Sequence, residues 1–258
     1  MPFLRSASVS LFCTCMPPGQ LEHTSLVTKA VGMEAEANCI VEGLADNASE
    51  AIQEKINNLE CSVIEIISDG STNDIVLEET LSLTHSAATN RSIEIIGPVG
   101  NGSDGAALIA PENGRHFHVE VQGEGSVLDL TLRNFIFRNG QVLQDAVPYG
   151  GSIYAASSND AVLNLNLTHN RFENNSAQHG GAVFVRGSAS TLSVSDLTFS
   201  DNKALLGAGI YANEAMLEVE ASTFTNNLTP YCGDGIIDGV NGVHGNYEEN
   251  CDDNNRSY

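Results

Sequence analysis

Gly150-Gly151-Ser152-Ile153-Tyr154-Ala155 begins a stretch that ends in Phe172-Glu173-Asn174-Asn175, and the chain repeats this pattern twice. The second copy runs from Gly180-Gly181-Ala182-Val183 to Phe199-Ser200-Asp201-Asn202, and the third from Gly207-Ala208-Gly209-Ile210 to Phe224-Thr225-Asn226-Asn227. The glycine-rich starts are 30 and 27 residues apart, and the Phe-x-x-Asn ends are 27 and 25 residues apart. A period of about 20 to 50 residues is typical of stacked units that cannot bury their apolar faces alone.

Each copy also contains short runs in which apolar and polar residues alternate, namely 162–167, 192–197 and 216–219. A period of two, broken by Gly, Ser, Asn and Asp, is typical of strands joined by turns. No helical stripe of about ten residues occurs within the repeats, and each copy is shorter than the about 40 residues of a propeller blade. The repeats therefore predict an all-β chain that forms a parallel β-helix, with one coil for each copy.

Matched positions of neighbouring coils lie directly above one another in such a solenoid, because the coils are spaced by about 4.8 Å. We therefore expect Phe172, Phe199 and Phe224 to form an aromatic stack inside the solenoid. A second set, Asn175, Asn202 and Asn227, is expected to form an amide ladder at a turn, since each amide both donates and accepts.

The two tetrapeptides together resemble the polymorphic outer-membrane-protein repeat over about residues 115–228. The resemblance implies a right-handed parallel β-helix of the kind found in surface-exposed adhesins and autotransporter passenger domains. Two departures from the pattern are visible. Phe137-Arg138-Asn139-Gly140 ends in Gly where Asn is expected, and the third start reads Gly-Ala-Gly-Ile.

The chain upstream of the repeats predicts further coils and a cap at their end. Asn47 and Glu50 have the spacing of a capping box, and Ile52, Ile56 and Leu59 share one helical face, so we expect a short helix over about 48–59. Such a helix would cover the unpaired edges of the first coil. The expected strands are Ser62–Ile67, Asp74–Leu83, Ser92–Ile96, Ala106–Ile109 and His116–Val121.

Four segments follow from these patterns. Residues 1–35 are expected to be a leader, either a signal peptide or a disordered stretch, because residues 1–18 carry one Arg and a weakly apolar run. Residues 36–61 are the expected N-terminal cap with its helix, and residues 62–229 the expected β-helix. Residues 230–258 form a cysteine-rich acidic tail.

Composition indicates a secreted or cell-surface product. The chain has 33 acidic and 11 basic residues and a net charge of −22, which disfavours nucleic acid as a partner because phosphate binding needs a basic patch. The excess negative charge suits a long, solvated β surface. No run of about 18 apolar residues is present, so we expect no transmembrane helix.

Four of the six cysteines form two local pairs, Cys39 with Cys61 and Cys232 with Cys251. As disulfides they would fasten the two ends of the solenoid, each by roughly 3 kcal/mol; free thiols in a reducing compartment are the alternative. Asn-x-Ser/Thr sequons make the chain a candidate glycoprotein if its host glycosylates asparagine. The seven sequons begin at Asn47, Asn90, Asn101, Asn166, Asn174, Asn227 and Asn255.

The tail carries a second motif, Cys232-Gly233-Asp234-Gly235-Ile236 followed by Glu249-Asn250-Cys251-Asp252-Asp253-Asn254. It resembles a cysteine-rich repeat of large secreted proteins from myxobacteria and protists, with Asn254 in place of the expected Gly and the last part missing, so we expect a truncated module. Its oxygen-bearing side chains suit Ca²⁺, although a solvated acidic loop is an equal alternative. The candidate ligands are Asp234, Asp238, Asn241, Glu249, Asp252 and Asp253.

An enzyme is the rival interpretation, because β-helices also host polysaccharide lyases and glycoside hydrolases of pectin-lyase-like fold. A hydrolase needs carboxylates on adjacent coils, and a lyase needs Ca²⁺-binding acids with a basic residue. The acids of the repeats are sparse and do not recur at matched positions. Four arginines read as isolated surface charges: Arg133, Arg138, Arg171 and Arg186.

Three histidines are candidate site residues. His179 precedes a glycine pair and reads as a polar turn residue, while His116 and His118 share a strand face and form either a metal-binding pair or an exposed pair. The sequence thus favours no catalytic residue and no cofactor apart from Ca²⁺ in the tail. The expected function is that of an adhesin-like or structural module, whose turn insertion at Gln141–Pro148 serves recognition of an extracellular glycan or protein. A diverged polysaccharide lyase or hydrolase is the alternative.

Overall fold

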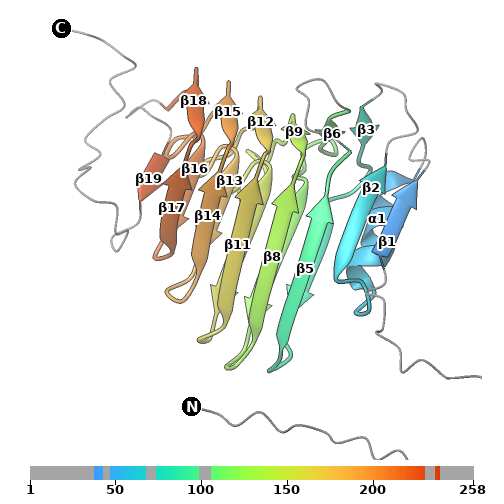
Figure 1. Ribbon diagram of the computed structural model, residues 1–258. Helices are drawn as coiled ribbons and strands as arrows, with labels where there is room; N and C mark the ends of the chain where they lie inside the picture. Colours follow the sequence, from blue (N-terminus) through green and yellow to red (C-terminus); the bar gives the residue numbers. More distant parts are fainter. Residues whose placement is uncertain (1–37, 43–46, 68–73, 99–105, 230–235, 239–258) are drawn as a thin grey trace, which may run out of the picture. The chain divides into compact units, whose positions relative to one another are not determined.

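The computed structural model describes residues 38–42, 47–67, 74–98, 106–229 and 236–238 (Figure 1). The chain divides into two units, residues 1–35 and 36–258, and the first lies outside the described residues. The described part of the second unit is mostly β, with strands that all pair in parallel. It contains one helix, α1 (Ala48–Asn57), and no helix there has the length and apolar character of a membrane span.

The strands form three sheets, which we call A, B and C. Sheet A consists of β1 (Asn38–Glu42), β2 (Val63–Ile67), β5 (Asn90–Ile96), β8 (Val127–Arg133), β11 (Val162–Thr168), β14 (Thr191–Ser195) and β17 (Met216–Glu220). Sheet B consists of β3 (Ile75–Val76), β6 (Leu108–Ile109), β9 (Ile136–Arg138), β12 (Arg171–Glu173), β15 (Thr198–Ser200) and β18 (Thr223–Thr225). Sheet C consists of β4 (Leu81–His85), β7 (Phe117–Gln122), β10 (Ile153–Ser158), β13 (Val183–Arg186), β16 (Ile210–Asn213) and β19 (Ile236–Asp238).

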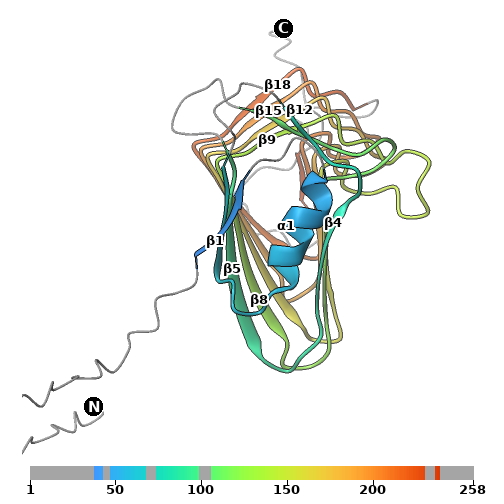
Figure 2. The same cartoon turned by 90° about the vertical axis from the view of Figure 1, so that its right-hand side faces the viewer.

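From β3 onward the chain visits the sheets in the constant order B, C, A. Each coil therefore adds one strand to each sheet, which is the strand arrangement of a parallel β-helix (Figure 1). Figure 2 looks along the coils, with α1 lying at their near end between β1 and β4. β1 pairs with β2, so sheet A begins within the segment that the sequence assigns to the cap.

The core lies between the three sheets and follows from the two-residue period of the strands. Leu128, Leu130 and Leu132 of β8 are fully buried, and they pair with Leu163, Leu165 and Leu167 of β11 on the next coil. Their strand neighbours face outward and are half-buried. Identical apolar side chains on successive coils make this face a continuous aliphatic column.

Helix α1 was predicted correctly in place but not in all details. Ile52 and Ile56 are buried as expected, but Leu59 is 80% exposed because the helix ends at Asn57. The predicted capping box is wrong, since Asn47 has a left-handed φ of 63° and its side chain caps no backbone group.

The side chains of α1 instead bind the first coil. Gln53 Nε2 donates to the carbonyl of Ser82 at 2.7 Å, and the Ser82 N–H donates to Gln53 Oε1 at 2.7 Å. The hydroxyl of Ser49 accepts from the N–H groups of Glu78 and Glu79 at 2.9 and 3.0 Å. β4 is the end strand of sheet C, so α1 satisfies edge groups that no strand pairs.

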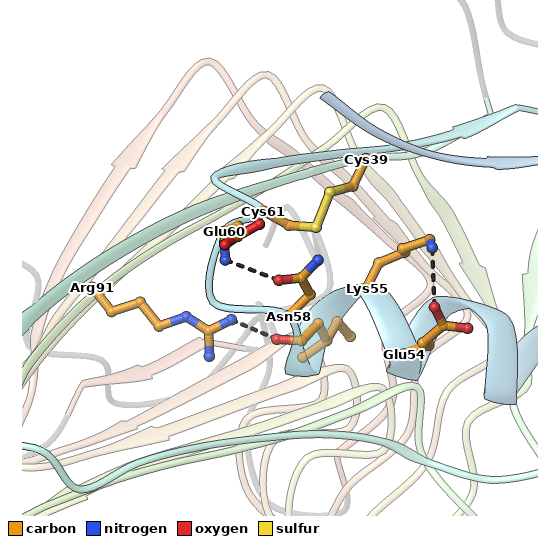
Figure 3. Close-up of a disulfide and its surroundings, with 8 residues drawn as sticks. Cys39, Glu54, Lys55, Asn58, Glu60, Cys61 and Arg91 are labelled. Atoms are coloured by element: carbon orange, nitrogen blue, oxygen red, sulfur yellow. Dashed lines mark hydrogen bonds and ion pairs between the residues drawn. A yellow bond between two sulfur atoms is a disulfide. The ribbon is translucent and has the colours of Figure 1, made fainter. Parts of the chain in front are cut away.

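A disulfide joins Cys39 of β1 to Cys61, with the two Cα atoms 5.7 Å apart (Figure 3). Beside it, Arg91 of β5 donates to the carbonyl of Ile56 in the last turn of α1. A cation at this place also suits the negative end of the helix dipole. The disulfide and Arg91 thus fasten the last turn of α1 and the residues just after it to sheet A. The other predicted pair, Cys232 and Cys251, lies outside the described residues.

Candidate functional site

The phenylalanines of the three repeats form one internal stack on sheet B. Phe172 and Phe199 have ring centroids 4.9 Å apart at an interplanar angle of 6°, and Phe199 and Phe224 are 4.6 Å apart at 3°. Phe137 continues the stack at 5.0 Å from Phe172, so the coil that lacks the final Asn still supplies its ring. Phe135, which the sequence did not single out, stacks on Phe137 at 4.8 Å.

The asparagines of the repeats form an amide ladder beside this stack. Asn175 Nδ2 donates to Asn202 Oδ1 at 3.0 Å, and Asn202 Nδ2 donates to Asn227 Oδ1 at 2.9 Å. Each amide also donates to a carbonyl of the coil before it, and the Asn202 and Asn227 oxygens accept the backbone N–H of the preceding asparagine. Asn175 and Asn202 are fully buried and Asn227 is nearly so. The asparagine that recurs at the end of each repeat therefore has its hydrogen-bonding groups satisfied within the turn.

Gly140 explains the coil whose motif lacks Asn. Its N–H donates to Asn175 Oδ1 at 2.8 Å. Gly140 therefore hydrogen-bonds to the end of the ladder without contributing a side-chain amide. A Cβ at this position would lie 2.0 Å from the carbonyl oxygen of Gly151. The ladder therefore begins where the backbone packing leaves no room for a side chain.

Charged side chains on the outer face of sheet B are paired across coils, so the prediction of isolated arginines is wrong for three of the four. Arg138 reaches Asp74 at 3.2 Å and Glu173 at 2.8 Å, and Arg171 also pairs with Glu173. On sheet A, Arg133 pairs with Glu94. The pairs are invisible in the sequence because their members are 35 to 64 residues apart, except Arg171 and Glu173. Arg186 lies exposed on sheet C.

The predicted pair of exposed histidines is also wrong. His116 is fully buried, with Nε2 2.8 Å from the carbonyl of Leu108 and Nδ1 2.9 Å from the hydroxyl of Ser152. Burial lowers the pKa of His116 to about 4, so its ring is neutral at pH 7. His118 faces outward and lies 3.2 Å from Glu120. The two rings therefore do not converge on one metal.

The outer face of sheet C carries a row of aromatic side chains, which is separate from the internal phenylalanine stack. Tyr154 and Phe184 lie on adjacent coils with centroids 5.5 Å apart at 2°, and Phe184 and Tyr211 are 5.6 Å apart at 7°. His118 extends the row at 4.8 Å from Tyr154. Tyr149 covers Phe184 at 4.9 Å and stacks on His179 at 5.0 Å. Burial lowers the pKa of His179, which favours its neutral form in this stack.

Arg115 fastens the turn insertion Gln141–Pro148 to this row. Its Nη2 donates to Asp145 at 2.7 Å and to the carbonyl of Val147 at 2.7 Å, and its Cζ lies 5.3 Å from the centre of the Tyr154 ring. The side chain is 2% exposed, and desolvation lowers the pKa of its guanidinium against the favourable Asp145 charge. The insertion and the half-buried rings of His118, Tyr149 and Tyr211 form the candidate recognition face, within which Tyr154 and Phe184 are buried.

The predicted calcium ligands fall almost entirely outside the described residues. Asp238 lies in β19, where only the backbone is described, and Asp234, Asn241, Glu249, Asp252 and Asp253 lie in the segments 230–235 and 239–258. Within the ranges that the structure describes, no three His, Cys, Asp or Glu side chains gather closely enough to hold a metal ion.

Comparisons with known proteins add no family name. No protein-family model, curated protein or solved structure matches the chain. The function must therefore be argued from the site itself.

Proposed function

We propose that the chain is a non-catalytic, secreted or surface-displayed module, a right-handed parallel β-helix of the polymorphic outer-membrane-protein repeat type with α1 as its cap. The observation that carries this proposal is the amide ladder. Asn175, Asn202 and Asn227, the polar residues that define the repeat, are buried and hydrogen-bonded to one another. The repeat therefore serves stability along the coil axis, and its outer faces are left to vary.

An extracellular location is supported by the Cys39–Cys61 disulfide, because disulfides persist in oxidising compartments. The net charge of −22 agrees with a solvated surface. Among the sequons, Asn47, Asn90 and Asn174 are exposed, whereas Asn227 is buried in the ladder. We include in the proposal a Cys232–Cys251 disulfide and one Ca²⁺ in the tail, and glycans at the exposed sequons in a host that attaches them.

The adhesin-like role rests on the candidate recognition face. Tyr211 and Tyr149 are only half-buried there, and aromatic side chains present large rigid contact areas at low entropic cost. The insertion Gln141–Pro148 is held by Arg115 and by Tyr149, which directly follows it, so its tip is displayed on a rigid base. An extracellular glycan or protein surface is the proposed partner.

Retention of bead-bound full-length chain on immobilised glycans and matrix proteins tests this role. We expect the chain to be retained. Tyr211→Ser should weaken this retention several-fold, because the substitution removes an accessible ring of the candidate recognition face. Met216→Ser, at an exposed position of sheet A, is the matched control and should leave retention unchanged. Equal retention of both variants would contradict the assignment of this face.

One observation favours the enzyme as a second candidate. Asp74, Arg138 and Glu173 lie within ion-pair distance on one face of sheet B, although they come from different coils. Acids and an arginine aligned in this way are the groups that a diverged polysaccharide lyase or hydrolase would use. Both carboxylates are already paired with Arg138, however, and Glu173 also pairs with Arg171.

A further inference from the structure

A groove runs beside the turn that leaves sheet B, along residues that directly follow the Phe137–Gly140 coil and the three repeats. Its volume is about 460 Å³, within the range of about 300 to 1,000 Å³ that is typical of small-molecule sites. Parallel bridges join Gln141 to Ser176, Ser176 to Lys203 and Lys203 to Leu228, so the groove crosses four coils. Ala177 and Ala204 leave its floor shallow and apolar.

Three leucines line this groove with a large part of each side chain in solvent. Leu143 is 50% exposed, Leu205 47% and Leu228 51%. Exposed leucines that gather in one hollow mark a binding surface more strongly than single ones do. An apolar chain lying in the groove would remove all three from water, and this favours an aliphatic ligand.

The polar groups of the groove indicate which head group an aliphatic ligand would carry. Lys203 is the one charged residue of the lining, and within the described residues it forms no ion pair. No carboxylate lines the groove, although acidic residues outnumber basic ones three to one in the chain. The charge of the groove is thus opposite to that of the molecule and complements an anion.

Ser176 adds an unsatisfied donor. The residue is only 8% exposed, and its hydroxyl has no hydrogen-bond partner. It lies between the exposed side chains of Gln141 and Lys203 on the neighbouring coils. A buried hydroxyl without a partner costs stability, so a ligand that accepts its hydrogen bond would recover that cost.

We propose that this groove binds an unbranched aliphatic carboxylate of the fatty-acid type. The chain of the ligand lies against Leu143, Leu205 and Leu228, and its carboxylate pairs with Lys203. The carboxylate also accepts from the Ser176 hydroxyl after a side-chain shift that uncovers this buried oxygen. The groove shares Gln141 and Leu143 with the insertion of the candidate recognition face, but none of the aromatic residues of that face lines it. Its shallow floor predicts a weak complex, with a Kd on the order of 1 mM for a ligand of about ten heavy atoms.

Methyl NMR of the full-length chain with ¹³C-labelled leucine tests the site, with sodium octanoate as the probe. We expect saturable shifts of the methyl groups of Leu143, Leu205 and Leu228. Leu59 is the matched control, because it is 80% exposed on the turn after α1, and its methyl groups should not move. Octanamide, which keeps the chain and lacks the charge, should bind about two- to five-fold more weakly, as expected for one exposed ion pair.

Two variants assign the head group. Lys203→Gln should reduce octanoate affinity to that of octanamide and leave octanamide binding unchanged, while Lys55→Gln on α1 should change neither. Ser176→Ala should weaken octanoate binding while the thermal midpoint stays the same or rises. No shift of the three leucines at 10-fold the expected Kd, or an unchanged octanoate affinity in Lys203→Gln, would overturn the proposal. Shifts produced by a leucine-terminated peptide and not by octanoate would assign the groove to a protein partner and would also overturn it.

Discussion

Gln53 and Ser82 exchange two hydrogen bonds, so that one side-chain amide of α1 pairs with the edge of β4 as a neighbouring strand would. An amide has one donor and one acceptor on the same side, which matches the spacing of the N–H and C=O of a single edge residue. Because β4 ends sheet C, this contact replaces the coil that is missing before it.

Gln53→Ala should therefore lower the free energy of unfolding by about 1–2 kcal/mol, because the N–H and the carbonyl of Ser82 lose their side-chain partner. Urea unfolding measures the change. Gln144→Ala, at an exposed position of the insertion, removes the same side chain without an edge contact and should change stability by less than about 0.5 kcal/mol. Equal effects of the two substitutions would show that α1 contributes no edge pairing.

Phe199→Ala should cost about 3–5 kcal/mol, because a fully buried ring in the middle of the stack leaves a cavity between Phe172 and Phe224. Calorimetric melting is the measurement. Met216→Ala is the control at a 45% exposed position. A melting shift for Phe199→Ala no larger than that of the control would refute the internal stack.

Asn202→Asp removes the amide donor that reaches both Asn227 and the carbonyl of Phe172, and it places a carboxylate in a buried site. We expect a loss of about 3 kcal/mol or more, since an uncompensated buried charge is strongly destabilising. Asn226→Asp, on the exposed turn of the next coil with φ of 54°, should be nearly neutral, because Asp tolerates this backbone conformation. Similar losses in both variants would contradict the ladder.

His116 should make the stability depend on pH between about 6.5 and 4. Its pKa is lowered to about 4 in the fold by burial, while the unfolded chain has a value near 6.5. The unfolded state therefore binds a proton first as pH falls. The contribution of neutral His116 to the free energy of unfolding is therefore fully present above pH 6.5. It decreases by roughly 3 kcal/mol on acidification to pH 4.

His116→Gln cannot bind this proton, so its unfolding free energy should fall less steeply with acidification through the same window. Urea unfolding at a series of pH values gives the slopes, which are compared whether or not the variant is less stable overall. Parallel slopes for the two proteins would show that His116 does not titrate differently in the fold.

The sequence repeat predicts the packing of side chains inside the solenoid better than the contacts of side chains on its outer faces. Phe172, Phe199 and Phe224 are found stacked because matched residues of equal coils must be neighbours. The outer row of Tyr154 and Phe184 occupies matched positions too, and aligning the glycine-rich starts would have revealed it.

Other contacts leave no such signal in the sequence. Arg138 meets Asp74 across 64 residues, and the coils between them have unequal lengths. The Gln53–Ser82 contact depends on where α1 lies at the end of the coils, which no periodicity specifies.

The central proposal, that this β-helix is a non-catalytic module, is tested most directly by incubating the full-length chain with polygalacturonate, pectin and alginate, with and without Ca²⁺. The measurement is the release of unsaturated uronides and of reducing ends over time. We predict no release above that of a heat-denatured sample. Sustained release that is abolished by Arg138→Gln or Glu173→Gln, and unaffected by Arg186→Gln, would contradict the account.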